Sequence, residues 1–260
     1  MTEFGINMTI YGSGIRRVLI GNAQNMGARP YQEDSFGFTE LSDSVADGKG
    51  FMAIVADGMG GLTDSGQISS YAVDFLIERF KGYDSSFSAD MWLDETVRSL
   101  NYSASAMKTG GGSTLAAVLC SRKGIYWCCV GDSRIYLLRR GMLYMLSEDG
   151  DYFTELLNGV LREEISYAEA EEDDRKTALT SYIGSGKEIE PEINKRPLLP
   201  EAGDTLLICS DGVYNALEER ELAEILKEAP GRAAAGIERS VLEMSFSNQD
   251  NFTAVILKYE

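Results

Sequence analysis

Fully apolar runs of strand length recur along the chain and alternate with amphipathic stretches. Four runs are almost entirely apolar, at 51–56, 125–130, 205–209 and 252–257. Such runs are typical of strands that are buried on both faces. Between them, apolar residues recur at helical spacing, most clearly over 64–81 and 88–107, which predicts helices with one buried face.

The order of these segments favours one class of fold. The strands at 113–121, 124–130, 134–139 and 142–146 are separated by short turns, which predicts an antiparallel meander. Helical segments fall between blocks of strands and do not follow every strand, so an α+β fold is favoured over a doubly wound parallel one. No linker or repeat interrupts the order. We expect a single domain, 1–260, with about ten strands and four or five helices.

An aspartate stands at one end of each buried run. Asp57, Asp132 and Asp211 directly follow or nearly follow the first three runs, and Asp250 precedes the fourth. An Asp-Gly pair alone is usually a turn. Because all four acids border fully apolar strands, the pattern predicts that their carboxylates meet at one edge of a sheet.

Composition narrows the possible chemistry. The chain has no histidine, so no imidazole can bind a metal or act as a general base. Its net charge of −17 argues against nucleic acid and anionic membranes as partners. The four cysteines lie in apolar runs and are interpreted as core thiols. With no signal peptide and no apolar run of the roughly 18 residues that span a bilayer, we expect a cytoplasmic protein.

Carboxylates gathered at one edge would repel each other unless cations lie among them. Glu33 and Asp34, in the polar loop 25–34, extend the acidic set. An all-oxygen ligand set selects Mg²⁺ or Mn²⁺, and two such ions about 3.5–4 Å apart can activate a shared water. Arg29 precedes a proline, which holds it in extended backbone, and its guanidinium suits a phosphoryl group. The residues therefore predict a metal-dependent phosphate hydrolase.

Several motifs match one family in order and spacing. The sequence resembles the PPM family, the type 2C metal-dependent serine/threonine protein phosphatases, and especially its compact bacterial members. The resemblance covers essentially the whole chain, and its motifs are RPYQED at 29–34, DGMGG at 57–61, GST at 112–114, GDSR at 131–134, LTSYIG at 179–184, SDG at 210–212 and DN at 250–251.

The resemblance implies a four-layer α-β-β-α sandwich, with two antiparallel sheets packed face to face and helices outside. It also implies two metal ions, Mn²⁺ or Mg²⁺, in a cleft at one edge. Asp57 resembles the ligand that bridges the two ions, and Gly58 would offer its carbonyl to one of them. Asp211 and Asp250 resemble ligands of the other ion.

Outer positions follow from the same resemblance. Glu33 and Asp34 look like ligands that act through water, and Arg29 matches the phosphate-binding arginine. Asp132 matches a position that can hold a third metal; a turn acid held by its neighbours is the alternative. Met59 stands where many eukaryotic relatives carry a histidine proposed as general acid, so leaving-group protonation must use metal-bound water or another acid.

The implied activity is hydrolysis of phosphoserine and phosphothreonine in proteins, as part of signalling, with a cognate Ser/Thr kinase as a candidate partner and a monomer as the expected state. A pseudophosphatase that only binds phosphoproteins, and a phosphodiesterase or nuclease, are the alternatives. Segment 148–187 is predicted to form a flap. Its acidic stretch, 163–174, is either a solvated face or a device that selects basic substrates.

Overall fold

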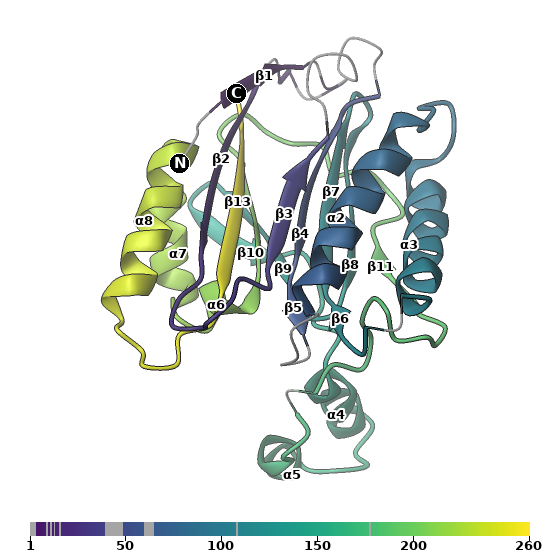
Figure 1. The fold of residues 1–260 in the computed structure, drawn as a ribbon. Coiled ribbons are helices and arrows are strands. Elements are labelled where there is room, and N and C mark those ends of the chain that lie inside the picture. Colours follow the sequence, from purple (N-terminus) through teal and green to yellow (C-terminus); the bar gives the residue numbers. More distant parts are fainter. Residues whose placement is uncertain are drawn as a thin grey trace.

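Two antiparallel sheets pack face to face, and helices cover both outer surfaces (Figure 1). The computed structural model describes all residues except 1–3, 9, 11, 13, 16, 40–48, 60–64, 108 and 177. The predicted four-layer α-β-β-α sandwich is confirmed. The described residues form thirteen strands and seven helices, more than expected, because several of the elements are only two to six residues long.

The first sheet has six strands in the order β1-β2-β13-β12-β9-β10, and neighbouring strands are antiparallel. It combines the two ends of the chain, since β13 pairs with β2 along its whole length. Its strands are Phe4–Asn7 (β1), Arg17–Asn25 (β2), Arg134–Arg139 (β9), Met142–Met145 (β10), Thr205–Cys209 (β12) and Phe252–Tyr259 (β13).

The second sheet has five strands in the order β11-β8-β7-β4-β3, again antiparallel. Its strands are Ser35–Phe38 (β3), Phe51–Ala56 (β4), Leu115–Ser121 (β7), Gly124–Val130 (β8) and Glu192–Ile193 (β11). A two-stranded ribbon of Gly58–Met59 (β5) and Gly112–Ser113 (β6) adjoins it. All six residues of β4 are buried, as the fully apolar sequence predicts.

Two helices cover each sheet, and a helical pair projects from one end (Figure 1). The five-stranded sheet is covered by Ser65–Lys81 (α2) and Ala89–Ser105 (α3), and the other by Glu219–Ile225 (α7) and Pro230–Glu243 (α8). Short helix Asp211–Tyr214 (α6) follows β12, and the projecting pair is Tyr152–Leu161 (α4) and Tyr167–Glu172 (α5). The predicted helix 64–81 is confirmed from its second residue, while Asp64 lies outside the described residues.

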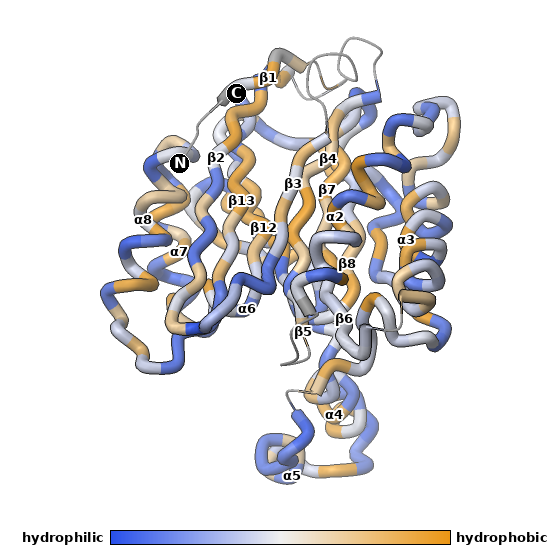
Figure 2. Tube along the Cα trace, in the orientation of Figure 1, coloured by the Kyte–Doolittle hydropathy of each residue, from blue (hydrophilic) through white to orange (hydrophobic). Residues whose placement is uncertain are grey.

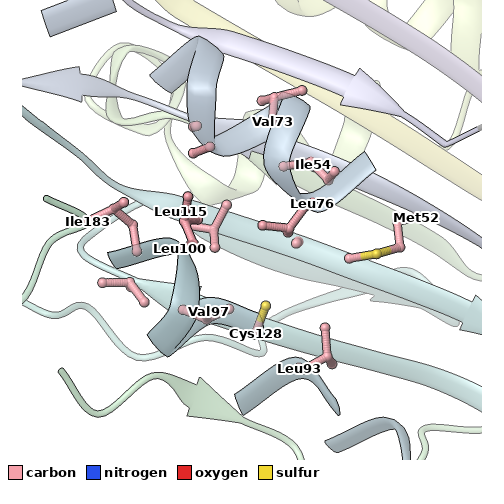
Figure 3. Packing of buried hydrophobic residues seen from close by; sticks show 14 of the residues in the cluster. Met52, Ile54, Val73, Leu76, Leu93, Val97, Leu100, Leu115, Cys128 and Ile183 are labelled. Carbon is pink, nitrogen blue, oxygen red and sulfur yellow. The ribbon is translucent and has the colours of Figure 1, made fainter. Parts of the chain in front are cut away.

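Three apolar clusters hold these layers together. One lies between the sheets and includes Val55 and Val255. The second joins the five-stranded sheet to α2 and α3 (Figure 3), and the third joins the six-stranded sheet to its helices. Cys128 belongs to the second cluster and Cys129 to the first, so the adjacent thiols point to opposite faces. Figure 2 shows β4, β7 and β13 as largely apolar segments.

One predicted feature, the four-stranded meander, is wrong. β7 and β8 pair with each other in the five-stranded sheet, whereas β9 and β10 belong to the six-stranded sheet. The chain crosses between the sheets at residues 131–133. Gly131 has a φ of +90° there, and a Cβ would lie 2.9 Å from Thr114. In the sequence, a glycine at such a crossing looks the same as a glycine in a hairpin turn. The prediction therefore took residues 131–133 for a turn within one sheet.

Candidate functional site

Antiparallel pairing brings two acids together at the end of the five-stranded sheet. Ser35 of β3 lies opposite Ala56 of β4, so Asp34, which precedes β3, is next to Asp57, which follows β4. The backbone of Asp57 is held by Thr114: its N–H donates to the threonine hydroxyl at 3.0 Å, and its carbonyl accepts from the threonine N–H at 2.8 Å. The end of β4 is therefore fixed.

The six-stranded sheet contributes a second pair in the same way. Cys209 of β12 lies opposite Ala254 of β13, so the chain leaving β12 runs beside the chain entering β13. This arrangement brings Asp211 and Asp250 to the same end of the sheet. The side-chain amide of Asn215 donates to Oδ2 of Asp211 at 3.1 Å, which orients that carboxylate.

Asp34 connects the two sheets. Its Oδ2 accepts hydrogen bonds from Thr253 of β13 at 2.8 Å and from Ser210, the residue after β12, at 2.7 Å, so both donors come from the side of the six-stranded sheet. Its Oδ1 is buried without a hydrogen-bond donor, unless a proton is shared with Asp57. Burial raises the pKa of Asp34 to about 6. A buried carboxylate oxygen of this kind is costly and calls for a proton or a cation.

The acids at this edge perturb one another. Burial, followed by the charges of Asp34, Asp211, Asp132 and Asp250, raises the pKa of Asp57 well above its ordinary value. Burial and then the charge of Asp250 raise the pKa of Asp211 to about 6. For Asp132 the pKa is also about 6, because of burial and then the charge of Asp211. The four strand-end acids thus act on one another's pKa, as groups at functional sites commonly do.

Arg29 reaches the same cluster from its loop. Its Nη2 donates to Oδ2 of Asp250 at 2.6 Å, and about half of the arginine side chain is exposed. Glu33 lies close by, because Arg29 lowers its pKa and Asp250 raises it. Burial is the larger effect and leaves the pKa of Glu33 raised overall. A solvent-facing guanidinium beside a carboxylate cluster can bind an incoming oxyanion.

Asn251 holds this loop in place, a role that the sequence reasoning missed. Its Oδ1 accepts from the backbone N–H of Glu33 at 2.7 Å. Its Nδ2 donates to the carbonyls of Met26 at 2.8 Å and Tyr31 at 3.0 Å. One buried amide therefore fixes three points of the loop. The sequence did offer one signal for this role. Asn251 is the second residue of the DN motif at 250–251, and only the first residue, Asp250, had been given a function.

Asp132 is not simply a turn acid held by its neighbours. The hydroxyl of Ser133 hydrogen-bonds Thr114 at 2.6 Å, and Arg134 forms a bidentate pair with Asp149 at 2.9 and 2.6 Å. These two neighbours are thus engaged elsewhere, and the side chain of Asp132 is left to the acidic cluster. This favours the metal-site alternative for Asp132.

Arg134 also ties the cluster to the start of the projecting segment. Its guanidinium lies 3.6 Å from the ring centroid of Tyr214, and its Nη1 donates to Tyr136 at 3.0 Å. The Tyr214 hydroxyl donates to the carbonyl of Asp132 at 3.0 Å. Since Asp149 lies just before α4, the half-buried Arg134 joins β9, α6 and the segment that carries α4 and α5.

The residues present fit hard divalent cations. They offer carboxylate and carbonyl oxygens, which are the ligands that Mg²⁺ and Mn²⁺ prefer. In the described part of the chain, no three acidic or cysteine side chains already enclose one point. Ions at this site would also need water ligands.

The glycines of the DGMGG motif are only partly described. Gly58 lies on β5, and its N–H donates to the carbonyl of Glu33 at 3.2 Å. Gly60 and Gly61 lie outside the described residues.

Comparison with known proteins gives one consistent result. Residues 31–239 match the family model described as Protein phosphatase 2C. The serine/threonine phosphatase stp of Listeria monocytogenes serotype 4b is 32% identical over 239 residues, which cover 88% of this chain and 91% of the relative.

Solved structures agree with this match. The serine/threonine phosphatase PstP/Ppp of Mycobacterium tuberculosis superimposes with a TM-score of 0.76 at 25% identity, covering 94% of this chain and 99% of that one. The catalytic domain of PstP, solved in complex with two manganese ions, gives a TM-score of 0.73 at 25% identity, with 93% and 98% covered.

Proposed function

Because the chain belongs to the protein phosphatase 2C family, we propose that it hydrolyses phosphoserine and phosphothreonine in proteins with a metal-activated water. One observation of the structure carries the proposal. Acids from separate parts of the chain converge at one edge of the sandwich, and the half-exposed Arg29 lies beside them. The alternatives of a pseudophosphatase and of a nuclease gain no support from any contact in this cluster.

The metal ligands are assigned residue by residue. Asp57 lies centrally, since the charges of the other four acids all raise its pKa, and it suits a ligand shared between two ions. Asp211 and Asp250 complete the set from the six-stranded sheet, with the carbonyl of Gly58 as a further oxygen. Divalent ions bound here would lower the pKa of a coordinated water and stabilise charge on the phosphoryl group.

Glu33, Asp34 and Asp132 take outer positions. Asp34 is nearly fully buried and accepts two hydroxyl hydrogen bonds, so it suits a water-mediated role. Asp132 lies in the field of Asp211 and is the candidate ligand for a third ion. Arg29 binds the substrate phosphate, for which it must share or leave its contact with Asp250.

Wider features complete the proposal. No helix in the described residues is long and apolar enough to cross a membrane. The four free cysteines are all buried, which suits a reducing compartment such as the cytoplasm. The chain is a single catalytic domain whose segment 148–187 acts as a flap, and it works as a monomer on phosphoproteins, opposite a Ser/Thr kinase in signalling.

One assay tests the proposed activity. Peptides carrying phosphoserine, phosphothreonine or phosphotyrosine are incubated with the protein while Mn²⁺ or Mg²⁺ is titrated. We expect phosphate release from the first two, dependent on metal and abolished by chelator. Asp211→Asn should lower kcat by roughly 100-fold or more, since a lost ligand costs at least as much as a lost outer partner. Absence of turnover at saturating metal would favour the pseudophosphatase alternative.

A further inference from the structure

A groove lies between the first turns of α3 and the segment that leads into β11. Its volume is about 730 Å³, within the range of sites that hold a ligand or a few side chains. The groove is far from the acidic cluster. Figure 1 shows that α2 begins beside β5, at the edge that carries this cluster. Its last residue, Lys81, directly precedes Gly82, which lines the groove. Its 17 residues correspond to about 25 Å of helix.

The walls of the groove are built and held. Trp92 packs against Tyr83, with ring centroids 4.7 Å apart, and against Phe80 at 6.1 Å. On the other side, Nη1 of Arg98 donates to the carbonyl of Ile189 at 2.6 Å, which fastens the segment before β11 to α3. Little backbone ordering is therefore needed when a ligand enters the groove.

Large apolar side chains border this groove and stay open to solvent. Phe87 is 66% exposed and Met91 is 71% exposed, although both lie beside Trp92, Pro191 and Ile193 in the groove lining. Aromatic and Met side chains in a pre-formed pocket are typical of the centres of protein interfaces. The exposure of Met91 is not needed for folding, because the buried residues of α3, such as Leu93 and Val97, lie on its other face.

The rim of the groove is acidic. Asp84, Asp90 and Glu95 line it, and among the described residues of the lining Lys195 is the one basic residue. Asp94 also lies there, but its carboxylate pairs with Arg98. Hydrogen bonds from Ser86 lower the pKa of Asp84, so this carboxylate is negatively charged at neutral pH. An apolar floor within a negative rim is complementary to apolar side chains flanked by Lys or Arg.

We propose that this groove is a docking site for a partner-protein segment in which apolar side chains are flanked by basic residues. Met91, Phe87 and Trp92 hold the apolar side chains of the segment, and Asp90 and Glu95 attract its basic residues. Binding here needs neither metal nor phosphate, because the groove lies about one α2 length, ~25 Å, from the acidic cluster.

The distance also limits the partner. If the docked segment belongs to a protein whose phosphorylated residue reaches the acidic cluster, about eight extended residues must separate the two, at ~3.3 Å per residue. β11 has only two residues, so it offers too few backbone groups for strand addition. The segment is therefore recognised by its side chains, in contrast to peptides that extend a sheet.

The test uses three synthetic ten-residue peptides without phosphate, labelled for fluorescence anisotropy. The first has Phe and Leu residues at its centre and Lys and Arg at both ends. The second replaces the basic residues by Glu, and the third replaces the apolar residues by Ser. We expect only the first to bind, with an affinity that falls when salt is raised from about 50 to 300 mM, because its charged contacts are exposed.

Two groove variants and two matched controls locate the binding. Met91→Asp and Glu95→Lys should each weaken the first peptide about tenfold or more, equivalent to ~1.4 kcal/mol. Met142→Asp and Glu221→Lys, at exposed positions elsewhere, should bind as the wild type does. Thermal unfolding verifies that every variant is folded. Met91→Asp should not destabilise α3, because position 91 lies in the first turn of this helix, where a negative charge interacts favourably with the helix dipole.

Three outcomes would overturn the proposal. One is no binding of the first peptide to the wild type, and another is equal binding by the groove variants. The third is a wild-type dimer in sedimentation that Met91→Asp dissociates, because the occupant would then be a second copy of this chain. The binding measurements use buffers without divalent ions and peptides without phosphate. Their outcome therefore does not depend on whether the protein shows phosphatase activity.

Discussion

The stability of the metal-free protein should fall as pH rises from 5 to 7. Burial raises the pKa of Asp34, Asp132 and Asp211 from 3.8 to about 6. An acid whose folded pKa is raised stabilises the fold most below its unfolded pKa, and this contribution is lost as pH rises through the folded value. The window therefore runs from about pH 4 to about pH 6 and a little beyond.

The size of the effect follows from the shift. Two pKa units correspond to about 3 kcal/mol for one carboxyl over the full window. Between pH 5 and 7 the loss is about 1 kcal/mol for each, because much of the unfolded-state ionisation is already complete at pH 5. The charges of these acids raise one another's pKa, so the three contributions are not additive and their sum of about 3 kcal/mol is an upper bound. For a chain of this length that bound corresponds to a fall in Tm of at most roughly 10 °C.

Thermal unfolding in chelator at pH 5, 6 and 7 measures this effect directly. We expect Tm to fall with pH in chelator and to stay nearly level with saturating Mn²⁺, because bound cations stabilise the ionised carboxylates. Asp250→Asn should flatten the slope in chelator, since the charge of Asp250 raises the pKa of both Asp34 and Asp211. A metal-free Tm that rises between pH 5 and 7, or equal stabilisation by Mn²⁺ at both pH values, would refute the reasoning.

Three further predictions concern single positions. Arg29→Ala should raise KM for phosphopeptides about tenfold with a small change in kcat, as for a uniform-binding group, and steady-state kinetics will check this. Arg134→Lys should lose the bidentate bond to Asp149 and speed proteolysis between α4 and α5 while the core stays protected. Gly27→Ala should destabilise the fold by a few kcal/mol in denaturant titration, because φ is +61° and a Cβ would lie 2.3 Å from the Asp250 carbonyl.

Elements defined by long apolar runs were predicted well from the sequence. β4, β12 and β13 match the runs 51–56, 205–209 and 252–257 almost residue for residue. Burial on both faces forces such strands to be apolar throughout, so their limits are visible in one sequence. Short elements fared worse. The four-residue helix α6 carries no periodic signal, and it was missed although Asp211 begins it.

The sequence predicted which acidic residues form the site, but it predicted only some of the contacts that hold them in place. The acids at strand ends were found because apolar runs mark those ends. The roles of Asn251 and Arg134 were missed, because both act through partners far away in the sequence: Asn251 contacts the loop around Tyr31, and Arg134 contacts Tyr214. Contacts of this kind depend on tertiary packing, and no local pattern reports them.

Convergence of the acids follows from strand direction. In an antiparallel pair, the end of one strand lies beside the start of the next. Asp34 precedes β3 and Asp57 follows its partner β4; Asp250 precedes β13 and Asp211 follows its partner β12. Each sheet thus supplies one such pair of acids, and face-to-face packing joins the pairs, as the hydrogen bonds from Ser210 and Thr253 to Asp34 show.

A cation bound among these acids would connect the two sheets, so metal binding should stabilise the packing between them and not only the loops. Val55 of β4 and Val255 of β13 belong to the cluster that fills this interface. Hydrogen exchange should therefore slow on addition of Mn²⁺ at the ends of β4 and β13 together. Protection confined to the loop around Arg29 would mean that the ions, if bound, engage only one sheet.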